Sequence, residues 1–169
     1  MLKEISIEKI KSDAEEVFKQ GGFYCSEAIV HSIRSNIAPE MPEAFVASAS
    51  GFPIGVGGSQ CMCGAVTGAV VALGYFFGRV QPTTPTDPKS LKCIALAYEV
   101  QDSFKKNHKV NCCHIHLKDI EMGSDEHKAQ CAAFTGEMAA KTAEIIAREL
   151  NLNVVDTAET KIAAAVGGN

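Results

Sequence analysis

The sequence predicts an all-α protein: a bundle of five or six helices in which a glycine-rich loop precedes a central buried helix. Three observations indicate this fold. Apolar residues recur at helical spacing in several segments, glycine and proline separate these segments, and no segment alternates apolar and polar residues as a half-buried strand does. A chain of 169 residues with 46% apolar residues fits a single domain over residues 1–169.

The first half of the chain contains three predicted helices, over residues 7–19, 25–36 and about 42–48. The first is amphipathic and ends at Gly21 and Gly22, as helices commonly end at glycine. In the second, Cys25, Ile29 and Ile33 recur at a spacing of four residues, which places the thiol on the apolar face.

The glycine-rich stretch over residues 51–60 cannot form a regular helix, because glycine costs about 1 kcal/mol and proline about 3 kcal/mol at each helical position. Three further helices are predicted after it, over residues 63–79, 88–106 and 125–150, and the tail, residues 151–169, is expected to hold one short helix ending at Gly167. The first of the three is apolar on nearly all sides and is therefore the expected central helix. Asp87 and Pro88 favour a helix start, and Ser124 is the expected N-cap of the last long helix.

Composition excludes several classes of function. A net charge of −4 argues against a nucleic-acid-binding protein, because phosphate binding needs a basic face. The longest apolar run is shorter than the about 20 residues that a membrane helix needs. The N-terminus has interleaved charges and no signal sequence, which predicts the cytoplasm, a reducing compartment where structural disulfides are rare. Seven cysteines in such a compartment indicate metal ligation, cluster binding or thiol chemistry.

Cys61 and Cys63 lie where the glycine-rich loop meets the central helix. Backbone N–H groups and the helix dipole at a helix N-terminus lower a thiol's pKa and stabilise thiolate, the form that binds metals and attacks disulfides. Cys63 as a small apolar core residue is an equally good interpretation of the position. The loop lacks the Gly-x-x-x-x-Gly-Lys pattern and follows no strand, so nucleotide binding is not expected.

A second group of candidates lies in a polar loop, where Cys112 and Cys113 precede His114 and His116. These residue types favour a ligand or redox role for at least one of the two cysteines. Covalent c-type haem is not supported, because Val110 occupies the position where a Cys-x-x-Cys-His motif needs its first cysteine.

The last helix adds His127 and Cys131, which are four residues apart and so share one face, as two ligands of one metal can. The alternative places His127 on the surface, which we favour, and Cys131 in the core. Cys93 has no partner nearby in sequence and is interpreted as a core residue. No Ser–His–Asp pattern or other conventional catalytic constellation stands out, so the sequence identifies no reaction.

These residues resemble the C_GCAxxG_C_C family of redox-active proteins over about residues 15–150. That family has a first cysteine on an early helix, here in Cys25-Ser26-Glu27-Ala28, and a glycine-rich run before a Cys-Gly-Ala-x-x-Gly motif, here residues 63–68. A third cysteine typically follows an asparagine, as Cys112 does here, and a fourth opens the final helix, as Cys131 does.

The resemblance implies a cofactor, because a related domain in split-Soret cytochrome c holds a four-cysteine iron–sulfur centre. By this resemblance, a [2Fe–2S] or [4Fe–4S] cluster, or tetrahedral zinc, would be held by Cys25, Cys63, Cys112 and Cys131. The chain departs from the pattern by carrying three additional cysteines, Cys61, Cys93 and Cys113. Cys113 makes the third ligand ambiguous, and Cys61 could replace or assist Cys63. The relative is also compatible with a homodimer, and electron transfer needs a redox partner protein that the sequence does not identify.

Three functions are therefore predicted, in order of preference. Electron transfer or redox sensing through a cluster requires the four sulfurs to converge in the fold. Thiol–disulfide exchange with Cys63 as the attacking group requires a close cysteine pair with one depressed pKa. A zinc-binding module would add a histidine nitrogen at the same centre, from His114, His116 or His127.

Overall fold

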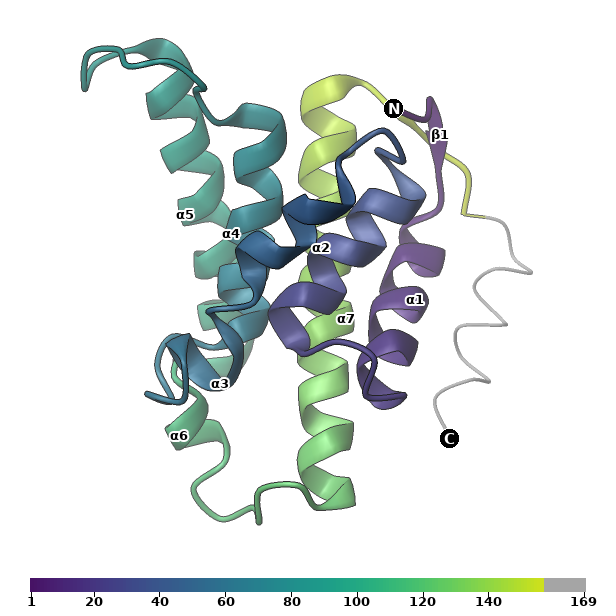
Figure 1. Ribbon diagram of the computed structural model, residues 1–169, viewed down its shortest axis with the longest axis vertical. Coiled ribbons are helices and arrows are strands. Elements are labelled where there is room, and N and C mark those ends of the chain that lie inside the picture. The colour runs from purple at the N-terminus through teal and green to yellow at the C-terminus, as the bar shows by residue number, and fades with distance from the viewer. Residues whose placement is uncertain (157–169) are drawn as a thin grey trace.

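The computed structural model describes residues 1–156 and has the predicted all-α fold (Figure 1). Five helices of 12 to 26 residues form the bundle: α1 (Ile7–Lys19), α2 (Cys25–Asn36), α4 (Gly64–Phe77), α5 (Pro88–His108) and α7 (Asp125–Leu150). Shorter helical segments lie between them: the 3-10 helix η1 (Glu43–Ala49), α3 (Pro53–Val56) and α6 (Cys113–His116). The predicted fold class is confirmed.

Side-chain caps explain where three of the long helices begin. Ser6, Asp87 and Ser124 each accept a hydrogen bond from a backbone N–H in the first turn of α1, α5 and α7 respectively. Such caps satisfy N–H groups that have no partner within the helix. The predicted N-caps of α5 and α7 are confirmed.

Helix α4 is the central helix, as predicted. It packs against α2, α5 and α7, and none of its residues is exposed. The close contact with α2 depends on Gly68, since a Cβ there would lie 2.6 Å from the Cα and carbonyl oxygen of Ser26. The small residues of α4 therefore allow the two helix backbones to approach each other.

Two local features differ from the prediction. Two strands, β1 (Glu4–Ile5) and β2 (Asn153–Val154), pair in parallel, although none was predicted, because two residues are too few to show alternation. Part of the polar loop near residue 113 is helical, as α6. The short helix predicted to end at Gly167 lies outside the described residues.

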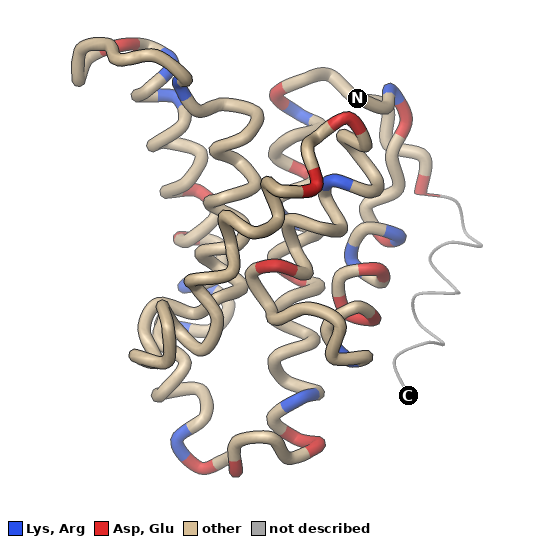
Figure 2. The backbone as a smooth tube through the Cα atoms, viewed as in Figure 1, with Lys and Arg blue, Asp and Glu red and all other residues tan. Residues whose placement is uncertain are grey.

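The charged residues are distributed unevenly along the chain. Residues 44–78 contain no Lys, Arg, Asp or Glu, so most of η1 and all of α3 and α4 are drawn tan in Figure 2. This uncharged stretch includes the glycine-rich loop and two of the candidate cysteines. Across residues 1–156, no helix combines the length and apolar character that crossing a membrane requires.

Candidate redox site of four thiols

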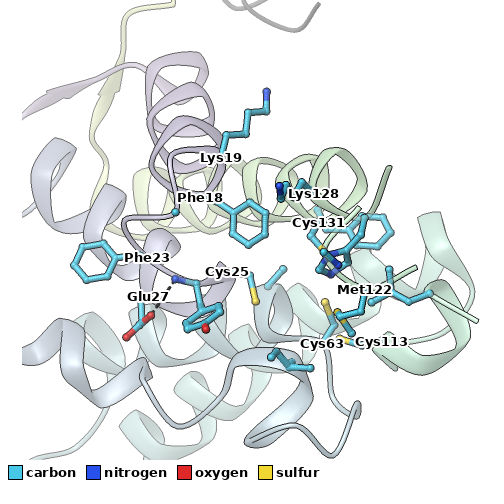
Figure 3. Close-up of a pocket in the computed structure, with 18 of the residues that line it drawn as sticks. Phe18, Lys19, Phe23, Cys25, Glu27, Cys63, Cys113, Met122, Lys128 and Cys131 are labelled. Carbon is cyan, nitrogen blue, oxygen red and sulfur yellow. Dashed lines mark hydrogen bonds between the residues drawn. The ribbon is translucent and has the colours of Figure 1, made fainter. Parts of the chain in front are cut away.

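A pocket of about 630 Å³ lies where the first residues of α2, α4 and α6 meet the second turn of α7. Four cysteines line it: Cys25, Cys63, Cys113 and Cys131. Figure 3 shows them around one space, brought there from four separate segments of the chain. The pocket that these four cysteines line is hereafter called the thiol pocket.

Backbone N–H groups point at three of the four sulfurs. Cys25 is the first residue of α2, and its sulfur accepts hydrogen bonds from the N–H groups of Ser26 and Ile54. Cys63 is the N-cap of α4, and the N–H of Ala65 bonds to its sulfur. The N–H of Gly64 bonds in turn to the sulfur of Cys113. Donors of this kind stabilise negative charge on sulfur.

Gly64 makes the close approach of these segments possible. A Cβ on this residue would lie 2.4 Å from the sulfur of Cys25 and 3.3 Å from the carbonyl oxygen of Phe52. Contact at 2.4 Å is far inside the van der Waals distance, so any larger residue would displace the thiol of Cys25. The glycine that follows Cys63 is therefore part of the site.

The Cys63 and Cys113 thiols shift each other's pKa in opposite directions. Donation from Cys63 to Cys113 raises the pKa of Cys63 far above its ordinary value, with burial adding to the rise. The same bond lowers the pKa of Cys113 to about 7, against the opposing effect of burial. The start of α4 therefore does not lower the pKa of Cys63, because the neighbouring Cys113 thiol and burial outweigh the N–H group of Ala65.

The other two thiols are kept protonated mainly by burial. Burial raises the pKa of Cys25 to about 11, with a smaller contribution from the charge of Cys113. Burial likewise raises the pKa of Cys131 to about 12, with smaller contributions from electrostatic coupling to Cys25 and Cys113. Cys113 thus raises the pKa of each of the other three pocket thiols.

The rest of the pocket wall is mainly apolar and aromatic, and includes Phe18, Phe23, Tyr24, Met122 and Phe134. Lys19 and Lys128 also line the pocket, but they lie 3.5 Å from Glu15 and 3.9 Å from Asp125 respectively. The Lys19 side chain points away from the sulfurs in Figure 3. No lysine or arginine is among the groups that shift the pKa values of these thiols.

Cys112, the third ligand implied by resemblance, does not line the thiol pocket. It forms a disulfide with Cys61, with an S–S distance of 2.03 Å, while its neighbour Cys113 lines the pocket. Cys112 is the N-cap of α6 and Cys113 its first residue, so the start of the helix separates the two side chains. The sequence could not decide between these adjacent residues.

A family model described as "Putative redox-active protein (C_GCAxxG_C_C)" matches residues 23–145. The chain belongs to this family. The matched region contains every cysteine of the thiol pocket and of the disulfide. No curated protein and no solved structure matches the chain significantly.

Of the three candidate histidines of this C_GCAxxG_C_C chain, one lines the pocket and two do not. His127 is half-buried in the first turn of α7 and lines the pocket, where its Nδ1 accepts a hydrogen bond from the N–H of Gly123 at 3.0 Å. His114 is exposed and does not line the pocket. His116 also lies elsewhere, since its Nε2 donates to the carbonyl of Val110 at 2.9 Å.

Two further observations concern metal binding in this family member. Within residues 1–156, no group of three or more His, Cys, Asp or Glu side chains is arranged closely enough to hold a single metal ion. Cys93 is half-buried, packs against the hydrophobic core and does not line the pocket.

Proposed function

We propose that this protein is an electron-transfer or redox-sensing protein whose four pocket thiols hold an iron–sulfur cluster. The observation that carries the proposal is the convergence of Cys25, Cys63, Cys113 and Cys131 on one pocket from four segments of the chain. Convergence of four sulfurs is the arrangement that a cluster requires, and the family description agrees with a redox role.

The donor set fits a cluster better than a single zinc ion. Zinc binds four ligands around one point, with Zn–S distances of about 2.3 Å. The described residues offer no such closely spaced group. In a [4Fe–4S] cluster each of the four thiolates would bind a different iron atom, and in a [2Fe–2S] cluster two thiolates would bind each iron, so the four sulfurs would surround a group larger than one ion. Of the three histidines considered for a zinc module, His127 lines the pocket, whereas His114 and His116 do not.

Residues of the protein around the sulfurs would position the cluster and adjust its reduction potential. The N–H groups of Ser26, Ile54, Ala65 and Gly64 donate to sulfur, and such hydrogen bonds adjust a cluster's potential. The apolar wall limits access of water. When bound, the cluster would supply a one-electron couple. The resemblance to the iron–sulfur domain of split-Soret cytochrome c supports the same assignment.

The test is anaerobic purification and reconstitution, followed by visible spectroscopy and assays for iron and sulfide. We expect stoichiometric iron and sulfide and an absorption that bleaches on adding dithionite. Cys25→Ser and Cys131→Ser should each abolish the signal, whereas Cys93→Ser, which alters a cysteine outside the pocket, should leave it unchanged. A colourless, iron-free wild-type protein after reconstitution would contradict the proposal.

A second candidate function, thiol–disulfide exchange, is favoured by the position of Cys63 and Cys113 on one pocket together with the lowered pKa of Cys113. In that reaction the sulfur of Cys113 attacks a disulfide of an external substrate, and the sulfur of Cys63 then displaces the substrate. Two electrons and two protons pass to the substrate, which leaves as a dithiol, and a Cys63–Cys113 disulfide remains. The metal-free protein should then reduce a model aromatic disulfide, and Cys63→Ser should accumulate the mixed disulfide on Cys113. A wild-type protein that shows no such reduction contradicts this candidate.

A further inference from the structure

The Cys61–Cys112 disulfide joins two segments that lie 51 residues apart in the chain. Backbone hydrogen bonds flank it on both sides. The N–H of Cys63 donates to the carbonyl of Asn111 at 2.6 Å, and the N–H of His114 donates to the carbonyl of Gln60 at 3.2 Å. Residues 60–63 and 111–114 therefore run antiparallel with the disulfide between them. This pair of segments is hereafter called the clamp.

The clamp carries two of the four pocket thiols. Cys63 lies two positions after Cys61, and Cys113 directly follows Cys112, so each segment contributes one cysteine to the disulfide and one to the pocket. The disulfide links the two segments that carry Cys63 and Cys113, so the distance between these two residues depends on it.

The two cysteines of the disulfide are more exposed than the two pocket cysteines of the clamp. Cys61 is exposed and Cys112 half-buried, whereas Cys63 and Cys113 are 4% and 7% exposed. An external thiolate can therefore reach the sulfur of Cys61. Exposed disulfides of this kind are the ones that exchange readily, in contrast to buried structural disulfides.

The segment that precedes the clamp is held in an unfavourable backbone conformation. Ile54 and Val56 are β-branched yet have φ of 54° and 46°, and Gln60 has φ of 63°. Left-handed backbone costs roughly 1–2 kcal/mol for each such residue, so contacts elsewhere must hold the segment. The N–H of Gln60 bonds to the carbonyl of Ile54 at 2.9 Å, which links the clamp to the pocket wall.

We propose that Cys61–Cys112 is a second redox site, a two-electron couple that exchanges with an external dithiol, and that its reduction loosens the wall of the thiol pocket. This site is separate from the cluster and stands whether or not the pocket holds metal. One thiolate of the dithiol attacks Cys61, and the bond to Cys112 breaks, so that Cys112 leaves as a thiolate and takes up a proton. The second thiol of the reductant then displaces Cys61, which also takes up a proton. Two electrons and two protons enter the protein, and the dithiol becomes a disulfide.

The redox couple is tested by equilibrating the full chain anaerobically with mixtures of reduced and oxidised dithiothreitol. After acid quenching and alkylation, mass spectrometry measures the peptide that contains the Cys61–Cys112 link. We expect the linked fraction to fall in one two-electron transition while circular dichroism shows unchanged helix content. Absence of the link at every ratio, or its loss only when the protein unfolds, would overturn the proposal.

The loosening of the pocket wall is tested by hydrogen exchange on the oxidised and reduced protein. Amides of residues 54–63 and 111–116 should exchange about tenfold faster after reduction, because local opening no longer has to preserve a covalent link, while α1 should not change. Cys61→Ser should exchange rapidly with or without reductant, and Cys93→Ser should behave as the wild type. Equal exchange in both redox states would overturn this part of the proposal.

Discussion

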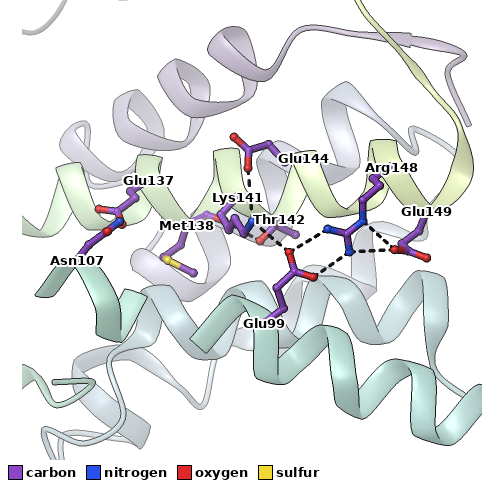
Figure 4. A network of polar contacts seen from close by, with 9 residues as sticks. All are labelled: Glu99, Asn107, Glu137, Met138, Lys141, Thr142, Glu144, Arg148 and Glu149. Carbon is purple, nitrogen blue, oxygen red and sulfur yellow. Dashed lines mark hydrogen bonds and ion pairs between the residues drawn. The ribbon is translucent and has the colours of Figure 1, made fainter. Parts of the chain in front are cut away.

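The two ends of helix α7 lie in different surroundings, an ion-pair network at one end and a thiol pocket at the other. Near its C-terminal end, Arg148 donates to both carboxylate oxygens of Glu99 on α5 at 2.9 and 2.8 Å, and Lys141 lies 3.1 Å from the same carboxylate (Figure 4). Glu149 completes this ion-pair network through Arg148 and Lys92. Near the N-terminal end, Cys131 faces three other thiols in a pocket with apolar walls.

The two regions differ in the partners of their ionisable groups. Every charge of the ion-pair network has a partner of opposite sign, and the network joins α5 to α7 without any further group. The thiol pocket gathers four ionisable groups whose partners are backbone N–H groups and one another. We infer that the network serves the fold, whereas the pocket serves a bound group or a reaction.

The largest expected effect on the fold comes from Gly68→Ala, at the contact between α2 and α4. The new Cβ would meet backbone atoms of Ser26 at 2.6 Å, which cannot rotate away. We expect a loss of about 3 kcal/mol in the free energy of unfolding, measured by urea denaturation. Gly74→Ala is the matched control, since nothing lies within 4 Å of its Cβ, and it should raise stability by about 0.5–1 kcal/mol. Equal stabilities for the two variants would contradict this packing.

Gly64→Ala should affect the pocket more than the fold. Its Cβ would meet the sulfur of Cys25, a side-chain atom that can move, so the expected cost is about 1–2 kcal/mol. Displacing that sulfur should lower iron binding after reconstitution about tenfold or more. Wild-type iron content in this variant would show that the position of Cys25 does not matter to the site.

The smallest effect is expected from Glu99→Gln in the ion-pair network. Hydrogen bonding with Arg148 lowers the pKa of Glu99 from 4.5 to about 2, so the carboxylate stabilises the folded state fully above pH 4.5 and loses this effect as pH falls towards 2. Because the pair is partly exposed, we expect a loss of about 0.5–1 kcal/mol near neutral pH.

Stability curves of this variant and the wild type at several pH values provide the measurement. The difference between them should shrink as pH falls below 4.5. Glu144→Gln, which removes a single contact of 3.6 Å to Lys141, is the control and should cost less. Iron binding should be unchanged in both variants, and a loss of iron there would contradict the separation of the two regions.

The sequence predicted the long helices well, because their apolar spacing, caps and glycine ends are local signals. The boundaries of α1 and α2 agree with the prediction, and Ser124 caps α7 as expected. The strands β1 and β2 are only two residues long and depend on contact between the chain ends, which no local pattern reveals.

The candidate site was predictable in part. Cys25, Cys63 and Cys131 lie on the pocket, but the choice between Cys112 and Cys113 depends on where α6 begins. The pKa order of the thiols depends on a contact between Cys63 and Cys113, which are far apart in sequence. The aromatic wall was missed, although Phe23 and Tyr24 directly before Cys25 are a signal for it.

The most direct test of the central claim compares Cys112→Ser with Cys113→Ser after anaerobic reconstitution. The two residues are neighbours, but only Cys113 lines the pocket. We predict that Cys113→Ser loses the iron, the sulfide and the visible absorption, whereas Cys112→Ser keeps all three. Iron retained by Cys113→Ser and lost by Cys112→Ser would contradict the assignment of the four pocket thiols as the cluster ligands.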